Sequence, residues 1–172
     1  MPDLVHLVAV TDELQRRGVP YALGGSGLLH SLGLTDKVRD WDLTTEAPKE
    51  QVEEALRHLV VQEGKSGDYP FGSAYKLVIH QEDPQVEILS RFSIHTDKGL
   101  CRLPTVPASV WNGIRVGSPE VWYAAYALMN RQDKADLLFS YLKEKGADWR
   151  AIQILTQEPL PDEVRERLVS LA

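Results

Sequence analysis

Two aspartates one residue apart, Asp40 and Asp42, are the side chains of this 172-residue chain best suited to chemistry on a metal ion. The segment Asp-Trp-Asp-Leu has the alternation of a β-strand, which places both aspartates on one face and Trp41 and Leu43 on the other. Two carboxylates about 6.6 Å apart along a strand can bind the same divalent cation. An edge strand with one hydrated face would show the same alternation, so this segment alone leaves both interpretations open.

Glu87 offers a third carboxylate, because it interrupts the otherwise apolar segment Val86-Glu87-Ile88-Leu89. A charge in such a strand must face either solvent or a partner, since an isolated buried carboxylate is costly. A hydrated hairpin face would satisfy this requirement, and so would a site shared with the two aspartates. In the second case Glu87 would be a third carboxylate beside Asp40 and Asp42.

The sequence Gly24-Gly25-Ser26 predicts a turn between an apolar strand and a short helix. The start of a helix offers unpaired N–H groups, and glycines allow a phosphate to approach the backbone closely. The serine hydroxyl adds one more donor. The glycine spacing differs from that of a Walker A loop and of the dinucleotide fingerprint, and a plain strand-to-helix turn would have the same composition.

The predicted elements have an order that can bring these residues together. Hydrophobic periodicity indicates a helix over 3–17, a strand over 19–24, and a helix over 27–32 with Ser26 as its N-cap and Gly33 after its end. The pattern then predicts a strand over 39–45, a helix over 47–61, a hairpin of strands 73–80 and 85–92 with its turn at 82–84, an irregular stretch over 93–107, a short strand over 111–117, and helices over 118–130, 132–146, 148–156 and 160–171.

This order defines the expected fold class, an α/β (α+β) arrangement of a small mixed sheet flanked by helices. The expected organisation is a core over residues 1–117 and a C-terminal helical extension over residues 118–172 that packs on it. A chain of this size can bury a hydrophobic core of its own.

Composition is typical of a globular protein. The residues are 43% hydrophobic and 26% charged, and the formal net charge is −6 at neutral pH. No apolar run approaches the ~20 residues of a membrane span and no segment has the pattern of a signal peptide, so we expect a cytoplasmic protein without a membrane partner. The acidic balance argues against a broad nucleic-acid surface and suits a site that gathers carboxylates around a cation.

Taken together, Gly-Gly-Ser before a helix, an Asp-x-Asp strand and an acidic residue on a later strand resemble the DNA polymerase β-type nucleotidyltransferase superfamily. The similarity covers residues 21–92 and is locally greatest to the branch of tRNA CCA-adding enzymes and poly(A) polymerases. The resemblance implies that Asp40, Asp42 and Glu87 are catalytic carboxylates and the ligands of a two-metal Mg²⁺ site.

The resemblance also implies contacts to the phosphates of an NTP such as ATP from Gly24, Gly25 and Ser26. The segment 131–144 is similar to the helix after the core in small and antibiotic-type nucleotidyltransferases, which makes Lys134 a further nucleotide-binding residue. A solvated amphipathic helix would explain the same segment. The base-selecting segments of the CCA-adding branch have no counterpart here.

The function implied is transfer of a nucleoside monophosphate from an NTP to a hydroxyl acceptor, with release of pyrophosphate. Glu87 would complete the second metal site or take the acceptor's proton. We expect a small-molecule or protein acceptor rather than a long nucleic acid, because basic residues after Ser118 are interspersed with acidic ones. The alternatives are a non-catalytic nucleotide-binding or protein-interaction module that keeps this fold, and a plain structural domain.

Overall fold

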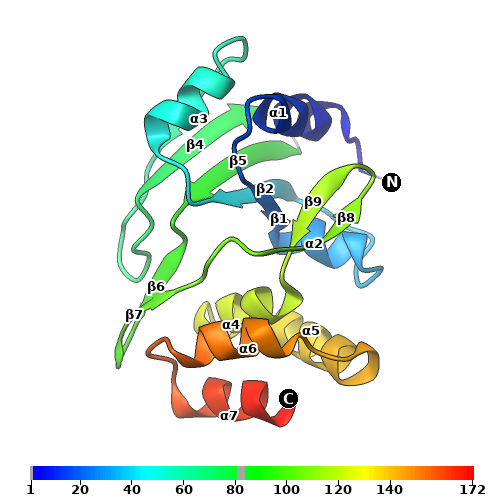
Figure 1. Ribbon diagram of the computed structural model, residues 1–172, viewed down its shortest axis with the longest axis vertical. Coiled ribbons are helices and arrows are strands. Elements are labelled where there is room, and N and C mark those ends of the chain that lie inside the picture. Colours follow the sequence, from blue (N-terminus) through cyan, green and yellow to red (C-terminus); the bar gives the residue numbers. More distant parts are fainter. Residues whose placement is uncertain (1, 81–83) are drawn as a thin grey trace.

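The computed structural model describes residues 2–80 and 84–172, which form a mixed β-sheet with helices on both of its faces (Figure 1). The strands are β1 (Ala22–Gly24), β2 (Asp40–Thr45), β3 (Gln62–Gly64), β4 (Tyr75–His80), β5 (Gln85–Ser90), β6 (Ser93–Thr96), β7 (Gly99–Arg102), β8 (Pro107–Trp111) and β9 (Ile114–Gly117). The helices are α1 (Val5–Arg16), α2 (Gly25–Ser31), α3 (Lys49–Ala55), α4 (Pro119–Leu128), α5 (Gln132–Lys145), α6 (Trp149–Thr156) and α7 (Asp162–Ser170).

The described residues include a seven-stranded sheet with the order β3-β4-β5-β2-β1-β9-β8, and β6 and β7 pair separately. Strand β2 runs parallel to β5, and β1 runs parallel to β9, whereas the other neighbours in the sheet are antiparallel. The expected mixed α/β fold is therefore confirmed, with a larger sheet than the sequence pattern indicated.

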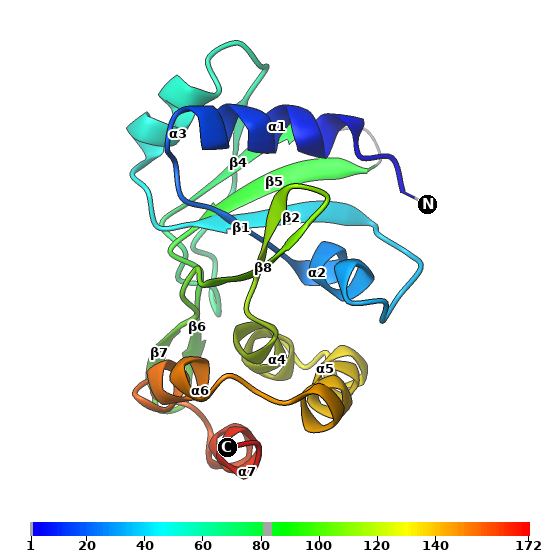
Figure 2. The same cartoon turned by 45° about the vertical axis from the view of Figure 1, so that its right-hand side comes forward.

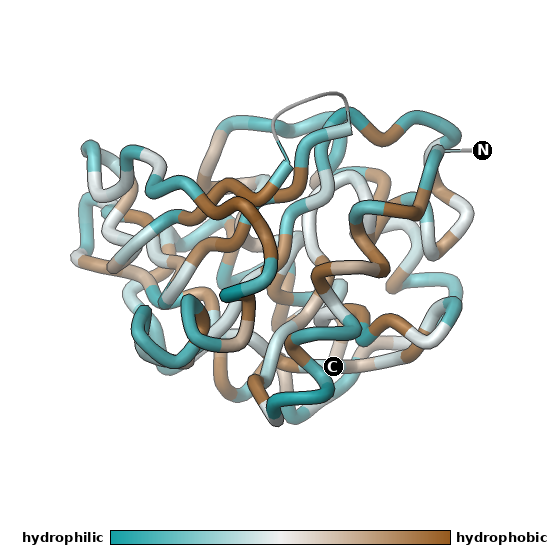
Figure 3. The backbone as a smooth tube through the Cα atoms, turned by 90° about the horizontal axis from the view of Figure 1, so that it is seen from above, coloured by the Kyte–Doolittle hydropathy of each residue, from teal (hydrophilic) through white to brown (hydrophobic). Residues whose placement is uncertain are grey.

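The central strands separate two helical layers. Helices α1 and α3 lie over one face of the sheet, and α4 to α7 lie beyond the opposite face (Figure 2). In β2 the side chains of Trp41 and Leu43 are fully buried, while Asp40 and Asp42 on the other face are half-buried. Figure 3 shows hydrophobic segments running through the middle of the molecule and hydrophilic ones concentrated towards its outside. The alternation in β2 thus directs both aspartates towards the layer of α4 to α7.

Three sequence-based predictions of short elements are wrong. The helix expected over 47–61 ends at Ala55, and the chain then forms the edge strand β3. The stretch 93–107 is not irregular throughout, because β6 and β7 form a hairpin within it. The single strand expected over 111–117 is a hairpin of β8 and β9, joined by Asn112 and Gly113 with positive φ angles of 50° and 76°. An Asn-Gly pair with both φ angles positive is typical of a tight hairpin turn.

The C-terminal helices agree with the sequence pattern. Ser118 caps α4, since its hydroxyl oxygen accepts a hydrogen bond from the backbone N–H of Val121 at 3.1 Å. One cluster of buried hydrophobic residues includes side chains from both the sheet and these helices. The division into a core over 1–117 and an extension over 118–172 stays a prediction. No helix in the described ranges is both long enough and apolar enough to cross a membrane.

Candidate active site

The carboxylates predicted from the sequence meet on neighbouring strands. In the parallel ladder of β2 and β5, Asp40 is opposite Gln85 and Asp42 is opposite Glu87. Side chains at paired positions leave the same face of a sheet, so Glu87 stands beside the two aspartates rather than behind them. The hairpin turn predicted at 82–84 falls mainly on residues 81–83, which lie outside the described residues.

The pKa of the Asp42 carboxyl group is strongly perturbed. Its pKa is raised from 3.8 to about 8, chiefly because burial disfavours the charged form and then because the charges of Glu87 and Asp40 are close. The side chain keeps partial access to solvent through a pocket on this face. A carboxylate in such surroundings requires either a proton or a cation.

Glu87 is held in place by two neighbours. Its Oε1 atom lies 3.2 Å from the ammonium nitrogen of Lys76 on β4, and it also accepts a hydrogen bond from the side-chain amide of Gln85. The side chain of Glu87 is 14% exposed and that of Lys76 is 29% exposed, so this ion pair is less screened by solvent than a surface pair. Lys76 thus places a positive charge beside Glu87 and close to Asp42.

The glycines of Gly24-Gly25-Ser26 are explained by close approaches. A Cβ atom on Gly24 would lie 2.0 Å from an indole carbon of Trp122, so only glycine admits that ring. Gly25 has a φ of +58°, and a Cβ atom there would lie 2.5 Å from Oδ2 of Asp42. The predicted N-cap is wrong: α2 begins at Gly25, and the Ser26 hydroxyl instead donates to the carbonyl oxygen of Asp40 at 3.4 Å.

A pocket of about 260 Å³ collects most of the predicted site residues. We call it the carboxylate pocket, and it is lined by Gly25, Ser26, Arg39, Asp40, Asp42, Phe71, Leu89, Phe92, Trp122, Tyr126, Met129, Arg131 and Lys134. Lys134 reaches it from α5, with its ammonium nitrogen 5.5 Å from the ring centre of Tyr126. Of the predicted residues, all of which the structure describes, Gly24 and Glu87 are not part of this lining, although each directly neighbours or pairs with a residue that is.

Sequence reasoning missed the cationic and aromatic parts of the lining. Arg39 directly precedes Asp40, and Arg131 lies three residues before Lys134. Their closeness in sequence to predicted site residues could therefore have indicated that both line the pocket. The spacing of Trp122 and Tyr126 is that of one helical face, which indicates core residues, and both are buried, at 5% and 4% exposure. Phe92 stacks on Trp122 with ring centres 5.4 Å apart. Their exposed edges nevertheless line the pocket, which helical periodicity alone could not reveal.

The donors present suit Mg²⁺ held together with a substrate. In the part of the chain that the structure describes, no three His, Cys, Asp or Glu side chains already converge as a ligand set. Mg²⁺ is usually bound by one or two carboxylates together with substrate phosphates and water. Asp40 and Asp42 provide such a pair at the pocket, and a cation would remove the repulsion that raises the pKa of Asp42.

Comparison with known proteins gives matches among solved structures alone: no family model matches the chain, and no curated protein does. A candidate nucleotidyltransferase from Thermotoga maritima aligns with a TM-score of 0.56 and 22% identity, over 82% of this chain and 92% of that chain. The crystal structure of ANT(2″)-Ia in complex with adenylyl-2″-tobramycin aligns with a TM-score of 0.59 and 16% identity, over 97% of each chain. The solution structure of the same antibiotic-resistance factor aligns with a TM-score of 0.55 and 19% identity, over 98% and 92%.

These similarities establish the class of fold. The chain shares its fold with these nucleotidyltransferase structures, which agrees with the resemblance in its sequence. At identities of 16 to 22% the likeness concerns the fold, so the chemistry has to be argued from the chain's own residues.

Proposed function

We propose that this protein is a metal-dependent nucleotidyltransferase that moves a nucleoside monophosphate from an NTP to a hydroxyl group. The observation that carries the proposal is the lining of the carboxylate pocket. Asp40 and Asp42 on β2 line one cavity together with the cationic side chains of Arg131, the residue before α5, and Lys134 on α5. Carboxylates that bind a cation, combined in one pocket with cationic groups that bind phosphate, suit the triphosphate of an Mg²⁺–NTP complex.

The nucleotide would occupy the side of the pocket nearest α2 and α5. Gly25 allows close approach to the backbone there, the Ser26 side chain lines the wall, and Lys134 and Arg131 would neutralise phosphate charge. The aromatic edges of Trp122 and Tyr126 are available to the base or sugar. The base preference does not follow from this lining, because an aromatic face accepts any base.

Asp40 and Asp42 would hold the cation, and bound Mg²⁺ would supply Lewis-acid polarisation of the α-phosphate and charge neutralisation for the departing pyrophosphate. The acceptor oxygen attacks the α-phosphorus, the new P–O bond forms, and the bond to the β-phosphate oxygen breaks. We assign the hydroxyl proton to Glu87, which Gln85 and Lys76 orient. A second metal site at Glu87 is the alternative, and the Lys76 ammonium beside it disfavours another cation there.

The acceptor would be a small molecule or a protein side chain. The carboxylate pocket measures about 260 Å³, and the chain carries a net charge of −6, so an extended polyanion has little surface to bind. The structural neighbour ANT(2″)-Ia was solved with an adenylylated small molecule, which supports a compact acceptor.

The test is binding and transfer with α-labelled ATP, GTP, CTP and UTP, with Mg²⁺ or with a chelator. At about 100 times its dissociation constant, an Mg²⁺–NTP complex should stabilise the native protein by ~2.7 kcal/mol in a thermal melt. Asp42→Asn should abolish this stabilisation while the variant stays folded. Binding without transfer of label to any acceptor in a cell extract would favour the non-catalytic alternative, and no stabilisation by any NTP would reject the proposal.

A further inference from the structure

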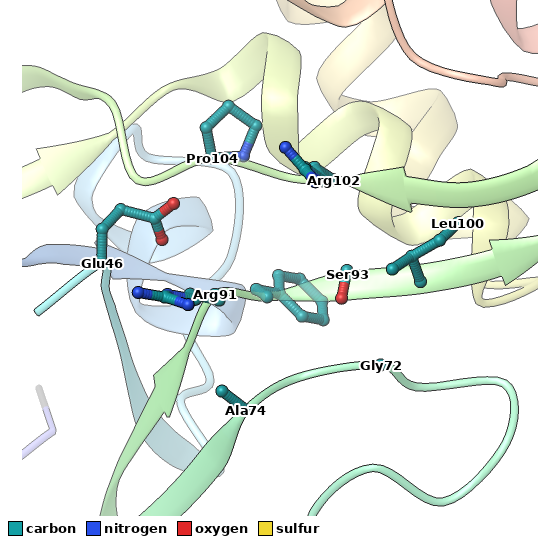
Figure 4. A pocket seen from close by; sticks show the side chains of 9 residues that line it. Glu46, Gly72, Ala74, Arg91, Ser93, Leu100, Arg102 and Pro104 are labelled. Carbon is teal, nitrogen blue, oxygen red and sulfur yellow. The ribbon is translucent and has the colours of Figure 1, made fainter. Parts of the chain in front are cut away.

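A second pocket of about 430 Å³ lies next to the carboxylate pocket and plays no part in the chemistry described so far. We call it the arginine pocket; it is lined by Glu46, Gly72, Ala74, Arg91, Phe92, Ser93, Leu100, Arg102 and Pro104. Figure 4 shows Arg91 and Glu46 close together at one end, with Arg102 beside Pro104 on another wall. Its volume is in the range of pockets that bind small molecules.

The two pockets are adjacent along the same face of the sheet. Phe92 lines both, and the consecutive residues Phe71 and Gly72 line one each. Glu46 continues the alternation of Asp40 and Asp42 just past the end of β2, about 13 Å from Asp42 along the strand direction. A molecule in the arginine pocket can therefore extend past Phe92 towards the aspartates.

One hydrogen-bonded threonine confirms that Glu46 lies on this face. The Thr105 hydroxyl lies 3.0 Å from that of Thr44, the residue between Asp42 and Glu46 on the same face, and 3.5 Å from a carboxylate oxygen of Glu46. Because Thr105 contacts both side chains, Asp40, Asp42, Thr44 and Glu46 lie in sequence along one face, and the last of them lines the arginine pocket.

The lining of this pocket is cationic and its charges are not fully compensated. Among the described residues, neither Arg91 nor Arg102 has a carboxylate oxygen within 4.0 Å of its guanidinium group, and Glu46 is the one acidic residue of the lining. Arg91 has a φ of 48°, and its backbone N–H donates to the carbonyl oxygen of Thr45 at 2.9 Å, which fixes its position at the end of the β2–β5 ladder.

Guanidinium groups bind planar or tetrahedral oxyanions through paired hydrogen bonds. We infer that the arginine pocket is the acceptor subsite and that Arg91 and Arg102 bind an anionic group of the acceptor, a carboxylate or a phosphate, while the acceptor's hydroxyl reaches the α-phosphate near Asp42. This assignment rests on the proposed transferase function. It makes a polycationic acceptor such as tobramycin a poor fit for this chain, although the fold is shared with ANT(2″)-Ia.

The experiment compares two double variants with equal changes of charge. Arg91→Gln/Arg102→Gln removes the two guanidinium groups of the pocket, and Arg16→Gln/Arg57→Gln removes two exposed ones that pair with neighbours on their own helices or turns. Binding of glycerol 3-phosphate, glycerate, glycerol and tobramycin is measured by calorimetry, with and without Mg²⁺ and a non-hydrolysable NTP analogue. Thermal melts of each variant report folding and binding of the analogue.

We expect glycerol 3-phosphate or glycerate to bind the wild type, and the stronger of the two identifies phosphate or carboxylate as the preferred group. Affinity should fall by about tenfold or more in Arg91→Gln/Arg102→Gln and stay unchanged in the control, with the analogue's stabilisation retained in both. The inference is overturned if neither anion binds, if binding survives in the pocket variant, or if glycerol or tobramycin binds better. A wild type that binds the anions but no Mg²⁺–NTP would instead refute the transferase function, and with it the acceptor role.

Discussion

Asp42 on β2 and Glu87 on β5 are paired across a parallel ladder, so two carboxylates occupy neighbouring positions on one half-buried face of the sheet. Water alone does not screen them well, and the pKa of Asp42 rises to about 8, first because of burial and second because of Glu87. Lys76 compensates part of this repulsion through its ion pair with Glu87. The face is thus electrostatically unfavourable until a proton or a cation joins it, as expected of a site selected for binding rather than for stability.

The first prediction is that Asp42→Asn stabilises the metal-free protein at alkaline pH. The pKa of Asp42 is near 3.8 in the unfolded chain and about 8 in the folded one, so the folded state holds this proton more tightly. Stability from this group is present below about pH 4 and is lost as the pH rises towards 8. Asparagine does not ionise, so at about pH 9 the free energy of unfolding of the variant should exceed that of the wild type by on the order of 1 kcal/mol or more. Melts in chelator across this range measure the difference, and parallel curves for the two proteins would contradict it.

The second prediction concerns Lys76. Lys76→Gln removes the cation beside Glu87, so repulsion among the carboxylates increases and the metal-free protein should lose on the order of 1 kcal/mol. The same loss of positive charge should lower the Mg²⁺ concentration required for stabilisation by NTP. Lys65→Gln is the matched control, because Lys65 pairs with Asp68 at the same 3.2 Å but with 83% of its side chain exposed. Melting curves at increasing Mg²⁺ would show a shift for Lys76→Gln alone; equal behaviour of both variants would exclude an effect of Lys76 on the site.

The geometry of the carboxylates was predictable because it depends on local alternation. A strand places every second side chain on one face, so Asp40 and Asp42 had to be neighbours on a face wherever the strand lay. To predict the position of Glu87, its strand also had to be paired with β2. The order of the motifs suggested this pairing, and the β2–β5 ladder shows it. Helices α4 to α7 were predictable for a similar reason, since each has at least two turns of helical periodicity.

The short elements and the complete lining of the pocket were not predictable in this way. The strands β6 and β7 have four residues each, too few for a periodic signal. The helix was expected to run to residue 61 because apolar residues continue at helical spacing, but α3 ends at Ala55. The lining by Phe92, Trp122 and Arg131 depends on how α4 and α5 pack across the sheet, and tertiary packing of this kind leaves no local pattern in the sequence.

The third prediction separates backbone strain from contact with the site. Gly25→Ala places a Cβ atom at positive φ and within 2.5 Å of the Asp42 carboxylate, whereas Gly33→Ala meets the same backbone strain, at a φ of +77°, with no atom within 4 Å. Each substitution should destabilise the fold by roughly 1 kcal/mol or more through strain. Only Gly25→Ala should also displace Asp42 and reduce Mg²⁺-dependent NTP binding, measured by calorimetry. Equal NTP affinity in both variants would show that the glycine serves the turn alone.

The fourth prediction tests how the C-terminal helices are anchored. Glu120 on α4 is 2% exposed and accepts hydrogen bonds from the Ser118 hydroxyl at 2.9 Å and from the backbone N–H of Asp148 at 2.7 Å. Glu120→Ala should lower the free energy of unfolding by about 2–4 kcal/mol, because it leaves one buried and one partly buried donor without an acceptor. The exposed Glu144→Ala should change it by less than about 0.5 kcal/mol. Urea denaturation of both variants provides the comparison, and a change below 1 kcal/mol in Glu120→Ala would contradict this anchoring role.

The last prediction assigns the charge of Lys134 to the nucleotide. Two lysines of α5 lie over aromatic rings in nearly the same way: Lys134 is 5.5 Å from the ring centre of Tyr126, and Lys143 is 5.6 Å from that of Phe139. Only Lys134 lines the carboxylate pocket. Replacing either lysine by methionine removes one cation–π contact and one charge from the same helix, so both variants should lose comparable stability, about 0.5–1 kcal/mol.

Binding of Mg²⁺–NTP then distinguishes the two positions. Lys134→Met should weaken it by about tenfold, which corresponds to ~1.4 kcal/mol, whereas Lys143→Met should leave it unchanged. Since Trp122 lines the same pocket, its fluorescence during an NTP titration can report the affinity. The difference in NTP affinity between the wild type and Lys134→Met should also become smaller as the salt concentration increases, because salt screens the contact between a partly exposed ammonium and a phosphate. Equal affinities for the two variants would mean that Lys134 supports only the packing of α5 on Tyr126, and the phosphates would then have to be neutralised by Arg131 and Arg39.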